Sequence, residues 1–191
     1  MKYSLTKDET EVVTTDKQFI IARGERRVGK TFTAYSLIAQ AIFTTKYVQQ
    51  IFVILPSVRY VENFINNFID FLGDSKGSIT RIDRNHLYID FWDKSRIQFF
   101  ILSDILSYQF RGFPRPDLII IDDADYFTDY KQRRLFYAIK ENWFLRAWNS
   151  KLYISYYPIK KIDKLQALYR YANKNWYKGT LRFVHSVNVS F

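Results

Sequence analysis

One short segment constrains this chain more than any other feature of its sequence. Residues 24–31, with the sequence GERRVGKT, match the pattern G-x-x-x-x-G-K-[ST]. The glycines let the backbone curl until successive N–H groups point at phosphate oxygens. The lysine of such a loop reaches the β- and γ-phosphates, and the hydroxyl group after it is a magnesium ligand. The predicted nucleotide-binding residues are therefore Gly24, Glu25, Arg26, Arg27, Val28, Gly29, Lys30 and Thr31.

The segments on either side of this loop are those that a phosphate site needs. Residues 19–22 are apolar and predict a buried strand that leads into the loop. From residue 31 to about residue 46, apolar side chains recur at the spacing of one helix face. The positive N-terminal end of that helix would then point at the phosphates. This context favours a functional loop over a turn that matches the pattern by coincidence.

A second apolar strand ends in two carboxylates. Residues 118–121 read Leu-Ile-Ile-Ile and are followed directly by Asp122 and Asp123. We expect this strand to lie beside the strand of residues 19–22, so that Asp122 holds Mg²⁺ together with Thr31. Asp123 is then placed to orient or deprotonate an attacking water molecule. Acidic turns after strands also occur without function, but the phosphate loop upstream favours a catalytic pair.

The rest of the chain alternates apolar runs with helical patterns, which is typical of an α/β domain with a largely parallel sheet. We predict a helix that follows Ser57, has an inner stripe beginning at Val58, and ends at Gly73. Residues 79–102 alternate like β-hairpins. The other predicted elements are strands at 51–55, 152–155 and 180–184 and helices at 131–148 and 162–176. We expect one domain over residues 1–191, with three layers: a mainly parallel central β-sheet flanked by helices, as in P-loop NTPases.

Composition narrows the classes of partner and site. The net charge is +10, which suits either a nucleic-acid partner or a protein that is basic only for solubility. The chain has no cysteine, so disulfides and thiolate metal sites are excluded. Its two histidines, His86 and His185, show no metal-ligand spacing. No apolar run approaches membrane-spanning length, and the first residues lack the apolar core of a secretory signal, so we expect an intracellular protein without a membrane partner.

Four segments together resemble the ATPase domain of the large terminase subunit, the motor that packages viral DNA into capsids. Arg26 lies three residues before Gly29, as in many terminase loops. Residues 89–97 resemble the strand–turn–strand that precedes the second motif of that family. An Arg-Gly pair at 111–112 precedes the strand and acidic segment of residues 116–127. Residues 153–158, Tyr-Ile-Ser-Tyr-Tyr-Pro, occupy the position of the coupling motif. The order and spacing of these segments cover nearly the whole chain.

The resemblance implies a role for each matching residue. Arg26 would sense the γ-phosphate and Ser155 would link hydrolysis to movement, and Asp123, Arg26 and Lys30 would be the catalytic set. Gln18 either contacts adenine or is a surface residue at a strand end. The resemblance further implies ATP and Mg²⁺ as cofactors. Double-stranded DNA and a capsid portal protein would be the partners of a homo-oligomeric ring. This ring would work in the host cell cytoplasm at the procapsid.

The chain also departs from the family pattern. The family has glutamate at the position of Asp123, and aspartate is one methylene shorter. Either the site is reshaped, or Asp125 or a neighbouring subunit helps, or turnover is slow. Tyr156 and Tyr157 stand where small hydroxyl residues are typical. Terminases usually continue into a nuclease domain, and no carboxylate cluster of that kind is found here, so we expect no nuclease domain.

Two other functions fit the same sequence. One is a helicase-like or DNA-repair P-loop ATPase, which would use the same nucleotide chemistry without a capsid. The other is a nucleotide-binding, DNA-associated module with little turnover, which the aspartate at position 123 keeps open.

Overall fold

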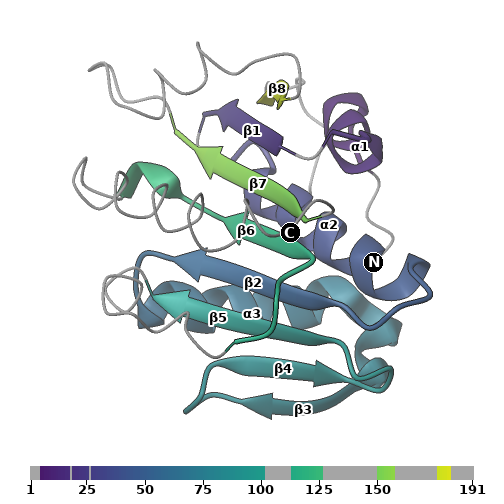
Figure 1. The fold of residues 1–191 in the computed structure, drawn as a ribbon. Coiled ribbons are helices and arrows are strands. Elements are labelled where there is room, and N and C mark those ends of the chain that lie inside the picture. Colours follow the sequence, from purple (N-terminus) through teal and green to yellow (C-terminus); the bar gives the residue numbers. More distant parts are fainter. Residues whose placement is uncertain are drawn as a thin grey trace.

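The computed structural model describes residues 5–17, 19–25, 27–101, 113–126, 150–157 and 176–181. The strands in these ranges are β1 (Phe19–Gly24), β2 (Gln50–Leu55), β3 (Ile79–Asp83), β4 (Tyr88–Phe91), β5 (Arg96–Ile101), β6 (Leu118–Ile121), β7 (Lys151–Tyr156) and β8 (Trp176–Leu181). They form one sheet in the order β3-β4-β5-β2-β6-β7-β1-β8 (Figure 1).

The sheet is mainly parallel. The pairs β8–β1, β1–β7, β7–β6, β6–β2 and β2–β5 are parallel, and only β3–β4 and β4–β5 among the described pairs are antiparallel. All four residues of β6 are buried, as expected for a strand that is covered on both faces. The predicted α/β class with a mainly parallel central sheet is therefore confirmed.

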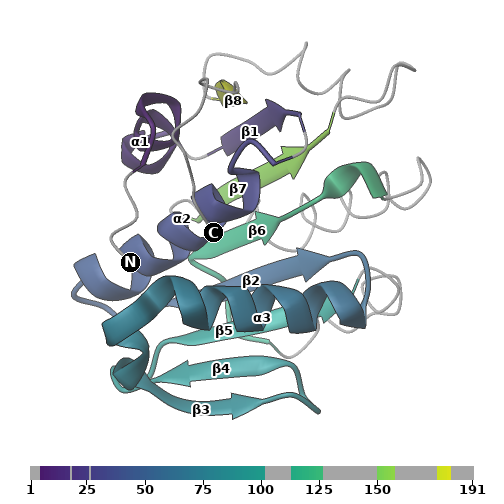
Figure 2. The same cartoon turned by 180° about the vertical axis from the view of Figure 1, so that it is seen from behind.

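The helices in the described part of the chain are α1 (Lys7–Thr14), α2 (Lys30–Thr44) and α3 (Val58–Leu72), with short 3-10 turns η1 (Gly73–Ser78) and η2 (Ala124–Tyr126). Figures 1 and 2 show α2 and α3 on the same face of the sheet. Buried side chains of both helices and of the sheet form one core, which includes Ile38, Phe64, Phe68, Val53, Phe99 and Ile120. The helices predicted at 131–148 and 162–176 lie outside the described residues, except for residue 176, which begins β8.

Helix α3 has the bounds that the sequence predicted. Ser57 is its N-cap residue with an extended backbone, although its side chain makes no capping hydrogen bond. Gly73 ends the helix with a φ of 53°, a conformation that favours glycine. The predicted inner stripe was wrong at Val58, which is 48% exposed, whereas Val61 is fully buried. Side chains of a helix lean toward its N-terminus, so a first-turn residue such as Val58 projects past the core.

Helix α1 was not predicted, although its start carries a recognisable signal. Thr6 and Glu9 form a capping box: the Glu9 N–H donates to Thr6 Oγ1 at 3.2 Å, and the Thr6 N–H donates to Glu9 Oε2 at 2.8 Å. This arrangement matches the S/T-x-x-E pattern of helix starts. Helix α1 packs against α2 and β8. At its end, Lys151 Nζ of β7 donates to the Thr15 carbonyl oxygen at 2.8 Å.

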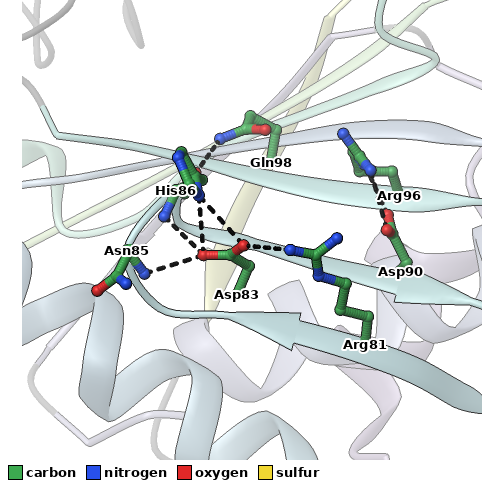
Figure 3. A network of polar contacts seen from close by, with 7 residues as sticks. All are labelled: Arg81, Asp83, Asn85, His86, Asp90, Arg96 and Gln98. Atoms are coloured by element: carbon green, nitrogen blue, oxygen red, sulfur yellow. Dashed lines mark hydrogen bonds and ion pairs between the residues drawn. The ribbon is translucent and has the colours of Figure 1, made fainter.

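Strands β3, β4 and β5 confirm the predicted hairpins. The β3–β4 turn is closed by Asp83, whose carboxylate accepts hydrogen bonds from the N–H groups of Asn85 and His86 (Figure 3). The His86 backbone bond lowers the pKa of Asp83 well below its usual range. In the next hairpin, Arg96 forms a two-bond pair with Asp90, at 2.6 and 2.9 Å. His86 is therefore a turn residue in this network.

The last strand was predicted too late in the chain. Strand β8 (Trp176–Leu181) begins before the predicted start at residue 180 and pairs in parallel with β1 from Phe19↔Trp176 to Gly24↔Leu181, whereas residues 182–184 of the predicted strand lie outside the described residues. The start of β8 is determined by its pairing with β1. The local sequence pattern carries no information about that distant pairing. Of the helices that the structure describes, none has both the length and the apolar character to cross a membrane.

Candidate active site

The strand order brings the phosphate loop and the acidic pair to one edge of the sheet, but not in the predicted way. Strand β6 does not lie beside β1. Strand β7 pairs with both, since Ile154 is the register partner of Ile21 in β1 and of Ile121 in β6. The sequence shows three similar apolar runs and gives no order for them. Because the three strands are parallel, the ends of β1, β6 and β7 still meet at the same edge.

The predicted phosphate loop, residues 24–31, turns sharply between β1 and α2. Arg27 and Gly29 have positive φ values of 65° and 85°, and Gly29 is the N-cap of α2. Lys30 is 7% exposed. Its Nζ donates to the carbonyl oxygens of Gly24 at 3.0 Å and Glu25 at 2.6 Å, so the loop closes around the lysine. Helix α2 begins at this lysine, and its N-terminal end therefore belongs to the loop.

The predicted loop residues differ in how far they are exposed to solvent. Val28 is half-buried, whereas Glu25 and Arg27 are exposed. Gln18 and Arg26 lie outside the described residues, so their predicted contacts with adenine and with the γ-phosphate stay predictions.

Asp122 is the centre of a buried cluster that joins α2, β6 and β7. Thr31 Oγ1 donates to Asp122 Oδ2 at 2.7 Å, and Ser155 Oγ donates to Asp122 Oδ1. Asp122 is 2% exposed. Burial raises its pKa, while the hydrogen bonds from Ser155 and Thr31 and the charge of Lys30 act in the opposite direction. The structure thus brings together Thr31, Asp122 and Ser155, three residues that the sequence singled out from distant segments.

Asp123 has an unusual backbone conformation. Its φ is 52°, in the left-handed region, where aspartate and asparagine are the best tolerated residues after glycine. Its N–H donates to Ser155 Oγ at 3.2 Å, so the same hydroxyl group contacts both acids. Asp125 lies in η2, and its Oδ1 accepts a hydrogen bond from the Tyr157 N–H at 2.9 Å. The residues after β6 are therefore tied twice to the end of β7.

The loop and the acids line one cavity of about 560 Å³. This volume is in the usual range for small-ligand pockets. The lining residues are Arg27, Gly29, Lys30, Thr31, Phe32, Asn67, Asp123, Asp125, Tyr126 and Tyr157. Lys30 and the acidic segment therefore face the same space.

Asn67 and Tyr126 line this cavity and were not predicted. Asn67 of α3 also hydrogen-bonds the Tyr35 side chain, and burial raises the pKa of Tyr35. Tyr126 packs on Tyr60 with ring centroids 5.4 Å apart, and a hydrogen bond between the two raises the pKa of Tyr60 to about 12. The sequence predicted only the inner apolar stripe of α3, and nothing in that pattern shows that Asn67, outside the stripe, lines the same cavity as Lys30.

The side chains present fit a magnesium–triphosphate group. Mg²⁺ prefers oxygen ligands, and the Thr31 hydroxyl and the Asp122 carboxylate are such ligands within 2.7 Å of each other. The Lys30 ammonium and the N-terminal end of α2 supply positive charge beside them. Ser155 holds the second carboxylate oxygen and so fixes the orientation of Asp122.

The sequence comparisons find no relatives: no protein-family model matches the chain, and no curated protein matches it in sequence. The fold, by contrast, is similar to solved structures of large terminases. The large terminase of a thermophilic bacteriophage superposes with a TM-score of 0.73 and 17% identity, over 99% of this chain and 48% of that one. The large terminase ATPase domain of Thermus phage P74-26 gives 0.67 and 14%, over 87% of this chain and 70% of that one.

The first of these terminases has also been solved in complex with ADP. That structure gives a TM-score of 0.70 with 20% identity, over 94% of this chain and 45% of that one. This chain thus spans about half the length of the thermophilic phage protein. At these identities the likeness establishes the fold, which is that of the large-terminase ATPase domain. The resemblance to large-terminase ATPase domains seen in the sequence is therefore confirmed for the fold.

Proposed function

We propose that this chain is an ATP-hydrolysing motor domain that drives translocation of double-stranded viral DNA into a capsid. One observation carries most weight: the hydrogen bond between Thr31 and the buried Asp122 joins the phosphate loop to the acidic strand end, beside a cavity that Thr31 and Asp123 line. The fold of large-terminase ATPase domains supports the choice of motor, and the terminase of the thermophilic phage was solved with ADP.

Nucleotide binding falls to the loop and the start of α2. Lys30 and the loop N–H groups bind phosphate oxygens, and Thr31 and Asp122 hold the metal ion. When bound, Mg²⁺ supplies positive charge that offsets the charge developing on the β- and γ-phosphate oxygens. The adenine contact of Gln18 and the γ-phosphate contact of Arg26 complete the proposed site.

Asp123 is the proposed catalytic carboxylate. Asp123 lines the cavity together with Lys30 and Thr31, where its carboxylate would orient a water molecule and accept its proton. The left-handed backbone and the bond to Ser155 fix the position from which this short side chain starts. Asp125 is the second candidate, although the Tyr157 N–H already holds one of its oxygens.

Ser155 is the proposed coupling residue because it contacts both acids from the end of β7. A displacement of Asp122 or Asp123 during the nucleotide cycle moves a hydrogen-bond partner of β7. The Asp125–Tyr157 bond gives the same strand end a second connection. The chain after β7 would transmit this change to DNA, and the net charge of +10 suits a phosphodiester partner.

The assembled motor would be a homo-oligomeric ring that meets a capsid portal protein at the procapsid in the host cell cytoplasm. These parts of the proposal come from the terminase likeness. A nucleotide-binding module with little turnover is the second candidate, and the short Asp123 side chain favours it.

The test is phosphate release with and without duplex DNA, combined with ATP-driven displacement of a third strand from a DNA triplex. The wild-type chain should hydrolyse ATP faster with duplex DNA and displace the third strand. Lys30→Ala should lose binding, turnover and displacement, whereas Lys76→Ala, an exposed lysine in η1, should behave as wild type. Nucleotide binding without Lys30-dependent turnover would favour the module, and turnover without strand displacement would refute the translocase.

A further inference from the structure

Glu9 is a buried acid that the proposed chemistry does not use. It is 5% exposed and lies in α1, outside the strands and helices that supply the loop and the acidic pair. A carboxylate is rarely buried unless its surroundings hold it in a defined place. The contacts of Glu9 point to such a place, at the C-terminal end of the phosphate loop.

The start of α1 fixes the orientation of the Glu9 carboxylate. Its Oε2 accepts the Thr6 N–H at 2.8 Å, while its own N–H donates to Thr6 Oγ1 at 3.2 Å. The first bond holds one carboxylate oxygen of Glu9 at the helix start, and the reciprocal bond holds the Glu9 backbone there. The other oxygen, Oε1, lies against the phosphate loop at Gly29.

Glu9 Oε1 occupies the space beside the Gly29 Cα atom. A Cβ atom built on Gly29 would lie 2.1 Å from Glu9 Oε1 and 3.2 Å from Glu9 Cδ. No side chain fits there while Glu9 keeps its position. Two independent features therefore require glycine at position 29. Its φ of 85° disfavours other residues, and the Glu9 carboxylate leaves no space for a Cβ atom.

The other contacts of this loop end come from the core of the domain. The Gly29 carbonyl oxygen accepts from the Thr33 N–H at 2.8 Å and from Thr33 Oγ1 at 3.0 Å. The Lys30 carbonyl oxygen accepts from the Tyr153 hydroxyl at 2.9 Å. Helix α2 and strand β7 thus hold the carbonyl groups of Gly29 and Lys30, and Glu9 of α1 lies against the Cα side of Gly29.

We propose that Glu9 is a positioning residue for the phosphate loop, so that α1 completes the nucleotide site from outside the core fold. This inference rests on the proposed nucleotide-binding function. A loop whose amides are already held in place loses less conformational entropy on binding and so binds phosphate more tightly. The anchor of α1 on the sheet, the Lys151–Thr15 bond, keeps Glu9 at the loop.

The first test compares affinities for a fluorescent ATP analogue, mant-ATP with Mg²⁺, at a temperature where all variants are folded. Glu9→Ala should weaken binding about tenfold, the equivalent of one lost interaction of ordinary strength. Glu9→Gln should recover most of the affinity because glutamine also serves in a capping box. Glu11→Ala, an exposed glutamate on the same helix, is the matched control and should bind as wild type.

The outcomes separate this inference from the proposed function. If the wild-type chain does not bind mant-ATP, the proposed nucleotide function fails. If it binds, Lys30→Ala does not, and Glu9→Ala binds as wild type, the nucleotide site stands and the role of Glu9 is refuted.

A second test distinguishes positioning of the loop from general support of the fold. In Glu9→Ala, amide hydrogen exchange should accelerate at residues 27–31 and stay unchanged in β2. Gly29→Ala should weaken nucleotide binding measurably, and the Glu9→Ala/Gly29→Ala double variant should lose less affinity than the sum of the two single losses, because the clashing carboxylate is gone. Uniform acceleration of exchange, or strictly additive losses, would overturn the proposal.

Discussion

Replacing Ser155 with alanine removes two hydrogen bonds at the end of β7. Ser155 is fully buried, and its hydroxyl donates to the Asp122 carboxylate and accepts from the Asp123 N–H at 3.2 Å. A bond to a charged group contributes about 2 kcal/mol and a neutral one about 1 kcal/mol. We expect the free energy of unfolding to fall by about 3 kcal/mol and the melting midpoint by about 6–12 °C.

The effect on activity should exceed the effect on stability. Without Ser155 neither acid is tied to β7 through this hydroxyl, and a misplacement of about 1 Å at such a site slows turnover on the order of a hundredfold. DNA-stimulated phosphate release, measured well below the melting midpoint of the variant, should therefore drop by one to two orders of magnitude. Affinity for ATP should change much less, because Lys30 and Thr31 remain.

Ser150→Ala is the matched control for this prediction. Ser150 is 2% exposed and donates to the Pro116 carbonyl oxygen at 2.5 Å, just before β7 begins. The Ser150→Ala variant loses one buried hydrogen bond, so its free energy of unfolding should fall by about 1 kcal/mol while its turnover stays unchanged. If Ser155→Ala keeps the turnover of Ser150→Ala, the hydroxyl at the end of β7 is only structural and the coupling argument is wrong.

The remaining predictions concern the catalytic acid, the core and the β3–β4 turn. Asp123→Asn keeps a residue that tolerates a positive φ but cannot accept a proton, so phosphate release should stop while calorimetric ATP affinity persists; full turnover would transfer the catalytic role to Asp125. Phe68→Ala should lower the free energy of unfolding in urea by about 3–5 kcal/mol, because the fully buried ring leaves a cavity, and a loss below about 1 kcal/mol would contradict its place in the core. Asp83 has a lowered pKa in the folded state, so its contribution to stability is complete above its ordinary pKa of 3.8 and disappears as the pH falls below that value. Urea unfolding of Asp83→Asn should therefore depend less on pH between about 5 and 2 than wild type, and equal slopes would show that the turn bonds do not act on this pKa.

Local patterns were sufficient wherever one segment determines its own structure. The four apolar residues 118–121 became β6, and the apolar spacing between Ser57 and Gly73 became α3. The sharp turn at Gly29 could also be predicted, because its backbone conformation is one that other residues rarely adopt, whereas the positive φ of Arg27 could not.

Features that depend on distant pairing were missed. Nothing in residues 152–155 shows that β7 enters the sheet between β1 and β6, yet this position is what brings Ser155 to Asp122. The same holds for Asn67, since helical spacing shows which side of α3 is polar but not which loop that side meets. Helix α1 is different: its Thr6–Glu9 capping box is a local pattern, so the start of this helix is predictable from the sequence.

The central claim is that the phosphate loop and the β6 acid share one metal-bound nucleotide, and calorimetry of ATP binding to wild type and Thr31→Val tests it most directly. Valine has nearly the shape of threonine but no hydroxyl group to bind a metal or Asp122. Wild type should bind ATP much more tightly with Mg²⁺ than with EDTA, and Thr31→Val should lose most of that difference. Equal affinity in Mg²⁺ and EDTA for wild type, or an unchanged magnesium effect in Thr31→Val, would contradict the claim.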